Sequence, residues 1–197
     1  MRPSKTFFYK MLYKDISSKL ENNKKLNFID FACGHGQLLH DFKFKNYIGV
    51  DIDQKEIHEL KLKFPNYKFF NEDILIYKSN IKCDLACCVE TMGFNKMFDE
   101  KNIAKTINNI TNNLNDGGCF YFNIHYDLYE KNKENLNFLS KNFKKIKIRR
   151  YGFLTNKRSR LIHKIFFQLE KIITKILVKG KYLYIKCEGY SPHFSTK

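Results

Sequence analysis

The stretch that decides the fold is Asn27-Phe28-Ile29-Asp30-Phe31-Ala32-Cys33-Gly34-His35-Gly36-Gln37-Leu38-Leu39, followed by Tyr47-Ile48-Gly49-Val50-Asp51-Ile52-Asp53. The first part predicts a buried strand that ends in an acid and turns through two glycines into a helix. Glycines let the backbone approach a ligand closely, because they carry no Cβ atom. The second part predicts a strand with Asp51 at its tip, where a carboxylate is placed to accept hydrogen bonds from ribose hydroxyls. Together the two parts predict a site for a nucleoside cofactor.

The rest of the chain alternates between strand and helix patterns. Helical spacing of apolar residues predicts helices over 6–20, 37–44, 54–64, 99–114 and 128–143. Apolar runs predict strands over 28–31, 47–51, 67–70, 85–89, 119–124, 145–151 and 182–187, with a turn at 115–118. We therefore expect an α/β, doubly wound, mostly parallel seven-stranded sheet with an antiparallel C-terminal strand.

We expect residues 1–197 to form a single domain, with a helical cap over 1–24. A basic amphipathic helix over 159–179 is expected as an insertion before the last strand. This helix is interpreted as a lid or dimer helix packed on the sheet, as an interfacial helix resting on anionic lipid, or as a face that binds nucleic acid. The second interpretation makes the stretch from Arg160 to Lys179 a candidate for peripheral membrane contact.

Acidic and imidazole side chains recur where predicted strands end, at Asp30, Asp51, Asp73, Glu90 and His125. In an open α/β sheet, ligands bind beyond the carboxyl ends of the strands. Because several such ends meet at one edge of the sheet, this convergence is stronger evidence for a site than any single motif. The chain is expected to leave the sheet at Glu90.

The residues around the glycines indicate which nucleoside cofactor is bound. A dinucleotide fingerprint has a third glycine where this chain has Leu39. A carboxylate at Asp30, immediately before the loop, would also repel a pyrophosphate. The same carboxylate suits a cationic ligand, such as a sulfonium nucleoside that carries an α-amino group. This charge argument favours S-adenosylmethionine over NAD.

These segments resemble the motifs of class I S-adenosylmethionine-dependent methyltransferases. The segment 30–36 is similar to their first motif, 49–52 to the second, 71–74 to the acidic turn after the third strand, and 84–90 and 114–118 to the fourth strand and the glycine turn that follows. The resemblance covers residues 27–124 and implies their Rossmann-like methyltransferase fold. Ala32 departs from it, since many members have glycine there.

The resemblance implies a cofactor-binding set: Asp30, Ala32, Cys33, Gly34, Gly36, Asp51, Ile52, Asp73, Ile74 and Glu90. Asp51 would bind both ribose hydroxyls, and Ile52 would pack on the adenine. Asp73 would accept from the adenine amine, with the Ile74 amide facing a ring nitrogen. Asp30 would hold the methionine amino group.

Methyl transfer needs a base only if the acceptor carries a proton on the attacking atom. His125 is our candidate, because imidazole titrates near neutral pH. Glu90 is the second candidate, although it would also line the methionine end. The pattern contains no metal-ligand spacing, and no metal is expected.

The run Glu90-Thr91-Met92-Gly93-Phe94 differs from the Asn/Asp-Pro-Pro-Tyr/Phe of methyltransferases that act on exocyclic base or glutamine nitrogens. It is similar to the segment found in small-molecule methyltransferases. We expect O-methylation of a small metabolite, a sugar or a lipid-linked acceptor. An RNA methyltransferase and a non-catalytic S-adenosylmethionine-binding adaptor at a membrane surface are the alternatives.

The net charge of +16 fits either an anionic partner or a compositional bias, since the lysines are scattered over nearly every segment. Nucleic acid is the less favoured partner. Six cysteines lie mostly in apolar runs without C-x-x-C spacing, which suits a reducing cytoplasm. No signal peptide is recognised, and we expect a cytoplasmic protein, with the inner face of a membrane as a possible docking place.

Overall fold

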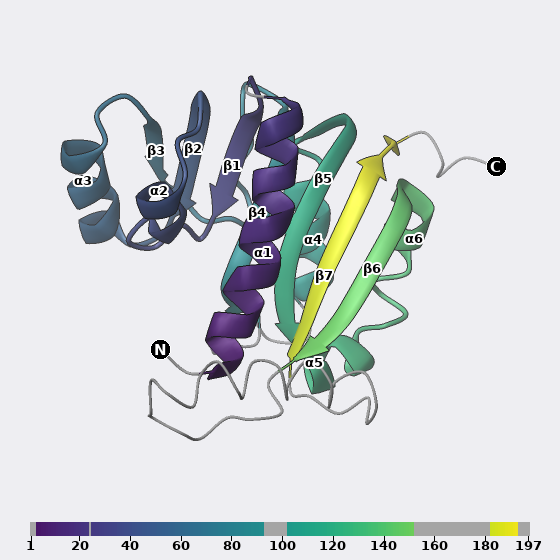
Figure 1. Cartoon of the computed structure of the whole chain (residues 1–197). Helices are drawn as coiled ribbons and strands as arrows, with labels where there is room; N and C mark the ends of the chain where they lie inside the picture. Colours follow the sequence, from purple (N-terminus) through teal and green to yellow (C-terminus); the bar gives the residue numbers. More distant parts are fainter. Residues whose placement is uncertain (1–2, 24, 93–101, 152–181, 193–197) are drawn as a thin grey trace.

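A seven-stranded sheet forms the centre of the computed structural model, which describes residues 3–23, 25–92, 102–151 and 182–192 (Figure 1). The strands are β1 (Asn27–Phe31), β2 (Asn46–Asp51), β3 (Lys68–Asn71), β4 (Cys83–Met92), β5 (Leu114–His125), β6 (Phe143–Tyr151) and β7 (Tyr182–Tyr190). The helices are α1 (Pro3–Asn22), α2 (Gln37–Asp41), α3 (Gln54–Lys63), α4 (Ile103–Thr111), α5 (Tyr126–Lys131) and α6 (Phe138–Asn142).

The strand order is β3-β2-β1-β4-β5-β7-β6. Strands β1 to β5 pair in parallel, whereas β7 is antiparallel to both β5 and β6. This confirms the expected α/β, mostly parallel, seven-stranded sheet with an antiparallel C-terminal strand. Because the order runs outward in both directions from the β1–β4 pair, the loops after these two strands open a crevice at the carboxyl edge of the sheet.

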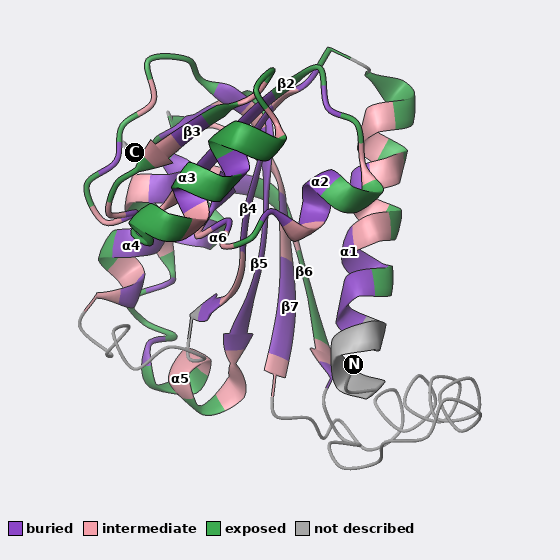
Figure 2. Ribbon diagram, turned by 90° about the vertical axis from the view of Figure 1, so that its left-hand side faces the viewer, coloured by how far each residue is buried: buried purple, intermediate pink, exposed green. Residues whose placement is uncertain are grey.

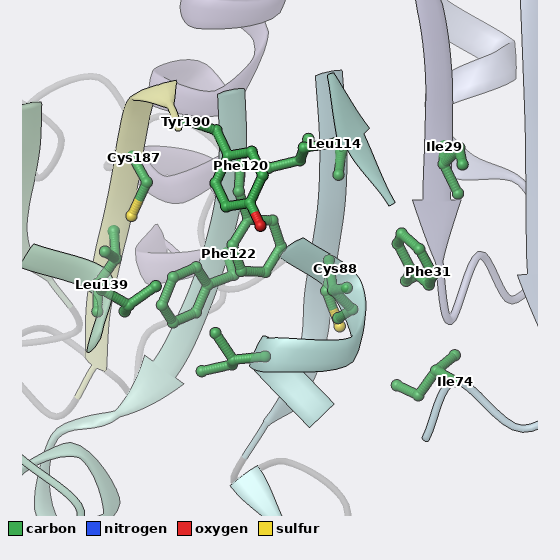
Figure 3. Close-up of a cluster of buried hydrophobic side chains, with 14 of the residues drawn as sticks. Ile29, Phe31, Ile74, Cys88, Leu114, Phe120, Phe122, Leu139, Cys187 and Tyr190 are labelled. Carbon is green, nitrogen blue, oxygen red and sulfur yellow. The ribbon is translucent and has the colours of Figure 1, made fainter. Parts of the chain in front are cut away.

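Helices cover both faces of the sheet (Figures 1 and 2). One core cluster packs α1, α2 and α3 on one face, and a second cluster packs α4 and α6 on the other. In the second cluster, Phe120 and Phe122 of β5 stack at 4.7 Å and lie near Cys88 of β4 (Figure 3). Since the central strands are buried on both faces, they read in sequence as nearly continuous apolar runs.

Helix α1 is held on the sheet by polar contacts as well as by its apolar face. Asp15 accepts hydrogen bonds from the Tyr184 hydroxyl at 2.8 Å and the Lys186 ammonium at 2.7 Å. Lys19 and Lys186 each lie 3.3 Å from the Glu188 carboxylate. These partly buried groups on β7 fix the position of α1, whose N-terminal turns lie at the carboxyl edge of the sheet (Figure 1).

One expected helix proves to be two. The sequence predicts a continuous helix over 128–143, but α5 ends at Lys131 and α6 begins at Phe138. Asn132 closes α5 by donating from its side-chain amide to the Leu128 carbonyl at 3.0 Å. Asparagine competes for backbone partners in this way and so favours helix ends over helix interiors. Likewise α2 stops at Asp41, because Phe42 is already extended.

Strands β4 and β5 extend furthest beyond the ranges that the sequence predicts. We expected the chain to leave the sheet at Glu90, yet β4 runs to Met92, which pairs with Ile124 across a register shift. The expected turn at 115–118 lies inside β5 as a second irregularity between Cys83 and Leu85 of β4. Both departures are bulges, and bulges bend a strand without ending its pairing.

The amphipathic helix expected over 159–179 lies outside the described residues, as do the start of the helix expected at 99 and the run after residue 92. Among the helices in the described ranges, none has the length and apolar character needed to cross a bilayer.

Candidate functional site

The loop between β1 and α2 is built from three residues with left-handed backbone. Ala32, Gly34 and Gly36 have φ angles of 57°, 49° and 72°. Two hydrogen bonds tie this loop to β2: the Cys33 amide donates to the Val50 carbonyl at 3.2 Å, and the Gly34 amide donates to Asp51 at 2.8 Å. Ala32 therefore occupies a conformation that favours glycine, at a cost of about 1–2 kcal/mol.

A cavity of about 310 Å³ opens beside this loop at the carboxyl edge of the sheet. It is lined by Tyr9, Asp30, Ala32, Cys33, Gly34, His35, Gln37, Leu38, Asp51, Ile52, Asp73, Ile74, Leu75, Val89, Glu90 and Thr91. Four of these residues are acids, and no lysine or arginine is among the described residues that line the cavity. In a chain of net charge +16, this is a locally acidic site.

Asp30 is the most deeply placed acid of the cavity. Its side chain is 3% exposed, and its Oδ2 accepts a hydrogen bond from the Tyr47 hydroxyl at 2.9 Å. Within the described part of the chain, its buried Oδ1 has no hydrogen-bond partner. Burial, and to a smaller extent the nearby Asp51 carboxylate, raises the pKa of this carboxyl to about 7, although the Tyr47 hydrogen bond lowers it. An unsatisfied buried carboxylate oxygen in a cavity calls for a donor from a ligand.

Asp51 and Asp73 stand at the ends of β2 and β3. Asp51 accepts from the Gly34 amide through Oδ2 and from the Asp53 amide at 2.9 Å through Oδ1. Asp73 accepts from the Leu75 amide at 2.8 Å. Each carboxylate oxygen has more than one acceptor site, so both groups keep capacity for ligand donors.

Two isoleucines supply an apolar part of the cavity. Ile52 is 58% exposed, whereas Ile74 is 5% exposed and belongs to the core. A large exposed aliphatic side chain at the rim of an acidic cavity is placed to cover an apolar ring.

Glu90 has the second unusual backbone of the site, with a φ of 58° in the β4 bulge. Its amide donates to the Asn123 side-chain oxygen at 2.7 Å, and the Asn123 amide group donates to the Tyr151 hydroxyl at 2.7 Å. Asn123 and Tyr151 are both buried. A left-handed glutamate costs about 1–2 kcal/mol and persists only where its surroundings fix it.

The cavity brings together nine of the ten predicted cofactor-binding residues. The exception is Gly36, which begins α2 and lies against Leu60. His125 ends β5 and is not among the lining residues. Its ring packs edge-on against Tyr182 at 5.4 Å, and its Nδ1 lies 3.6 Å from Asp127. Its role as a base stays a prediction.

Tyr9 and Tyr47 are among the residues at the site that sequence reasoning missed. Tyr9 lines the cavity from α1, although the helical pattern of that segment pointed only to its apolar positions. Tyr47 reaches Asp30 from the neighbouring strand: Gly49 of β2 pairs opposite Asp30, and Tyr47, two residues earlier, points to the same face of β2. The strand register of β1 and β2 was the signal that could have revealed Tyr47.

Substituting the two loop glycines is expected to separate folding from binding. A Cβ atom at Gly36 would lie 2.7 Å from Leu60, so Gly36→Ala should lower the free energy of unfolding by about 2–3 kcal/mol. A Cβ atom at Gly34 meets nothing within 4 Å, so Gly34→Ala should cost only about 1 kcal/mol. Since Gly34 lines the cavity, that variant should lose roughly tenfold in cofactor affinity. Urea unfolding measures the stability of the two variants, and calorimetry measures their cofactor affinity. Equal losses of stability would contradict the different roles given to Gly34 and Gly36.

The lining residues fit S-adenosylmethionine better than a dinucleotide. The orphaned Asp30 oxygen is a partner for an ammonium group, and the absence of lysine and arginine from the described lining leaves no counter-charge for a pyrophosphate. The two carboxylates at the ends of β2 and β3 are spaced along the sheet edge for ribose and adenine donors. Ile52 offers an apolar surface to the base.

Comparison with known proteins agrees with this fit. Residues 8–155 match the family profile described as a methyltransferase domain. A search of curated proteins finds no match.

Solved structures share the fold at low sequence identity. The N-methyltransferase NodS from Bradyrhizobium japonicum aligns with a TM-score of 0.62 and 12% identity over 93% of this chain and 97% of that one. The plantazolicin methyltransferase BpumL, solved with S-adenosylhomocysteine, gives 0.61 and 14% over 94% and 85%. An amino pentose methyltransferase from Micromonospora echinaspora, solved with S-adenosylmethionine, gives 0.50 and 13% over 58% of this chain and only 50% of that one.

A family match over residues 8–155, on a sheet and cavity of this construction, settles the classification. The chain belongs to the methyltransferase domain family and is an S-adenosylmethionine-dependent methyltransferase.

Proposed function

We propose that the chain transfers a methyl group from S-adenosylmethionine to an oxygen or nitrogen atom of a small-molecule acceptor. The observation that carries this proposal is the acidic cavity with its unsatisfied Asp30 oxygen. The sequence led us to expect an oxygen acceptor on a metabolite, a sugar or a lipid-linked compound. NodS is described as an N-methyltransferase, and another of the structural neighbours acts on an amino pentose, so a nitrogen acceptor has equal standing.

The proposed cofactor contacts follow the order of the strands. Asp73 and the Ile74 amide would face the adenine, Ile52 would cover it, and Asp51 would accept from the ribose hydroxyls. Asp30 would hold the methionine ammonium through its Oδ1 atom. This arrangement lays the cofactor from β3 across β2 toward β1 and β4, so the methyl group would lie near the β4 bulge.

S-adenosylmethionine, when bound, supplies a methyl group on a sulfonium that leaves readily. The protein's own task is to orient the acceptor behind that methyl group and to exclude water, which can contribute roughly 7–11 kcal/mol. Glu90 lines the cavity at this end, and His125 is more remote, at the end of β5. Either would take a proton from the acceptor where the acceptor carries one.

Release of S-adenosylhomocysteine tests the proposal. Purified protein is incubated with S-adenosylmethionine and fractionated small-molecule, lipid and RNA extracts, and we expect release with a small-molecule or lipid fraction. Binding of S-adenosylhomocysteine without turnover in any fraction would overturn the proposal in favour of a non-catalytic adaptor. Turnover confined to the RNA fraction would overturn the small-molecule acceptor.

Asp51→Asn is expected to weaken cofactor binding about 10- to 100-fold, because hydrogen bonds to a charged group are worth about 1.5–3 kcal/mol. The asparagine NH₂ would also face the Gly34 or Asp53 amide, donor against donor. Asp53→Asn is the matched control. Asp53 caps α3 by accepting from the Lys55 and Glu56 amides, and asparagine caps equally well. Calorimetry with S-adenosylhomocysteine compares the two, and equal losses would contradict the role of Asp51.

A further inference from the structure

One acid of the cavity remains once the cofactor has its proposed partners. Asp51 and Asp73 face neutral parts of the adenosine, and Asp30 faces the ammonium group. Glu90 is the fourth carboxylate, and it also lines the cavity. A carboxylate at this end of the cavity can serve the methionine ammonium, the sulfonium or the acceptor.

The strand order places Glu90 at the reacting end. Asp73 lies two residues after β3, and Asp51 is the last residue of β2. Asp30 lies in β1, and Glu90 lies in β4 on the far side of β1. A cofactor with its adenine at β3 therefore points its methionine and methyl group toward β4.

Glu90 is held at this position in a strained backbone conformation. Its left-handed φ of 58° interrupts the pairing of β4 with β5, and the buried Asn123 side chain fixes its amide at 2.7 Å. Tyr151 accepts from Asn123 and stacks on Phe8 of α1 at 5.5 Å. The next residue of α1, Tyr9, lines the cavity, and its pKa is raised by burial and by Glu90. Strain held by a buried network points to function.

The described residues that line the cavity around Glu90 are acidic or neutral. Asp30 and Glu90 both lie near the Tyr9 hydroxyl, since the charge of each carboxylate raises the pKa of Tyr9. Val89, Thr91 and Tyr9 line the same end, and no lysine or arginine does so within the described ranges. A neutral hydroxyl acceptor can only donate a hydrogen bond to this carboxylate, whereas a protonated amine donates one and is also attracted by the negative charge of the whole site.

We propose that the acceptor is an amine that binds as its ammonium form against Glu90, and that Glu90 takes its proton. This deepens the proposed function and rests on it. The proton passes from the acceptor nitrogen to a Glu90 carboxylate oxygen. The freed nitrogen lone pair then forms an N–C bond to the methyl carbon while the C–S bond breaks, and S-adenosylhomocysteine leaves with that electron pair. Glu90 returns the proton to water.

Cofactor affinities of the Glu90→Gln variant distinguish a carboxylate that faces the acceptor from one that faces the sulfonium or the methionine ammonium. If Glu90 faced the sulfonium, the variant would lose affinity for S-adenosylmethionine but not for S-adenosylhomocysteine, which lacks that charge. If it faced the methionine ammonium, both affinities would fall. We expect both to stay within about threefold by calorimetry, while transfer falls at least about 100-fold. Glu90→Asp, which keeps the charge, should retain partial transfer. A tenfold loss of either affinity would overturn the proposal.

The binding preference of the acceptor site is tested with matched probes. Butylamine and 1-butanol are titrated by NMR into protein loaded with S-adenosylhomocysteine. We expect the amine to bind at least about tenfold more tightly, and Glu90→Gln to abolish the difference. Equal binding of the two probes would overturn the proposal.

The methylated atom can be identified without knowing the acceptor. The enzyme is incubated with a metabolite extract and S-adenosylmethionine labelled with ¹³C at the methyl carbon, and the products are examined by ¹H–¹³C correlation. N-methyl and O-methyl groups resonate in separate regions, and we expect N-methyl signals. O-methyl signals alone would overturn the amine acceptor and leave the proposed function intact. No labelled product, with cofactor binding retained, would overturn both.

Discussion

Asp30→Asn is expected to stabilise the cofactor-free protein at pH 8 and to weaken its binding of the cofactor. Burial raises the Asp30 pKa from 3.8 to about 7 in the folded chain. The folded state therefore holds a proton that the unfolded state releases, and stability falls as pH rises from about 4 through about 7. This loss is on the order of 4 kcal/mol. Asparagine does not ionise, but it buries an unsatisfied amide, so its net gain at pH 8 should be on the order of 2 kcal/mol.

Cofactor binding should move in the opposite direction. If Asp30 pairs with the methionine ammonium, only the ionised carboxyl binds well. The affinity of the natural protein for S-adenosylhomocysteine should then rise up to about tenfold per pH unit below pH 7 and level off above it. Asp30→Asn should lose this pH dependence and bind about 10- to 100-fold more weakly.

Urea unfolding at pH 5 and pH 8, with calorimetry at both, measures the two effects. Tyr47→Phe is the control, because the Tyr47 hydroxyl hydrogen bond lowers the Asp30 pKa. Its removal should move the pH dependence of binding to higher pH without abolishing it. If the free energies of unfolding of Asp30→Asn and the natural protein differed by the same amount at pH 5 and pH 8, that result would show that Asp30 does not titrate in this range.

Much of this site could be predicted because it lies on regular elements. The strand ends at Asp51 and Asp73 are set by apolar runs followed by polar residues, and parallel strands bring their carboxyl ends to one edge. The glycine loop is also local, since two of its three positions with left-handed backbone carry glycine, at Gly34 and Gly36. Local pattern therefore accounts for the part of the cavity formed by the glycine loop and by the ends of β2 and β3.

The backbone conformation of Glu90 could not be predicted in the same way, because long-range contacts determine it. Glu90 is held by Asn123, which is 33 residues away in sequence, and Asn123 by Tyr151, 28 residues further on. Glutamate has no preference for left-handed backbone, so nothing near Glu90 signals the bulge. Ala32 is a second example, since alanine in a sequence gives no sign of the left-handed backbone, with a φ of 57°, that this residue adopts.

Asn123→Leu is expected to be the most damaging single change in the network behind Glu90. Leucine has a similar size but leaves the Glu90 amide without its acceptor and the Tyr151 hydroxyl without its donor. Two buried polar groups that lose a partner should cost about 2–5 kcal/mol together. The β4 backbone would then relax toward the extended form, and transfer should fall at least about tenfold more than cofactor affinity. Urea unfolding, calorimetry and release of S-adenosylhomocysteine measure the three quantities.

Two further variants separate loss of the network from loss of the carboxylate. Tyr151→Phe keeps the ring stack on Phe8 and leaves Asn123 bonded to the Glu90 amide, so it should cost only about 1 kcal/mol and retain transfer. Glu90→Gly relieves the left-handed strain and should raise stability by up to about 1 kcal/mol while abolishing transfer. Asn123→Leu and Glu90→Gly thus share a loss of activity but change stability in opposite directions. If both lowered stability alike, the bulge would not be strained, and Asn123 would serve packing and not the placement of Glu90.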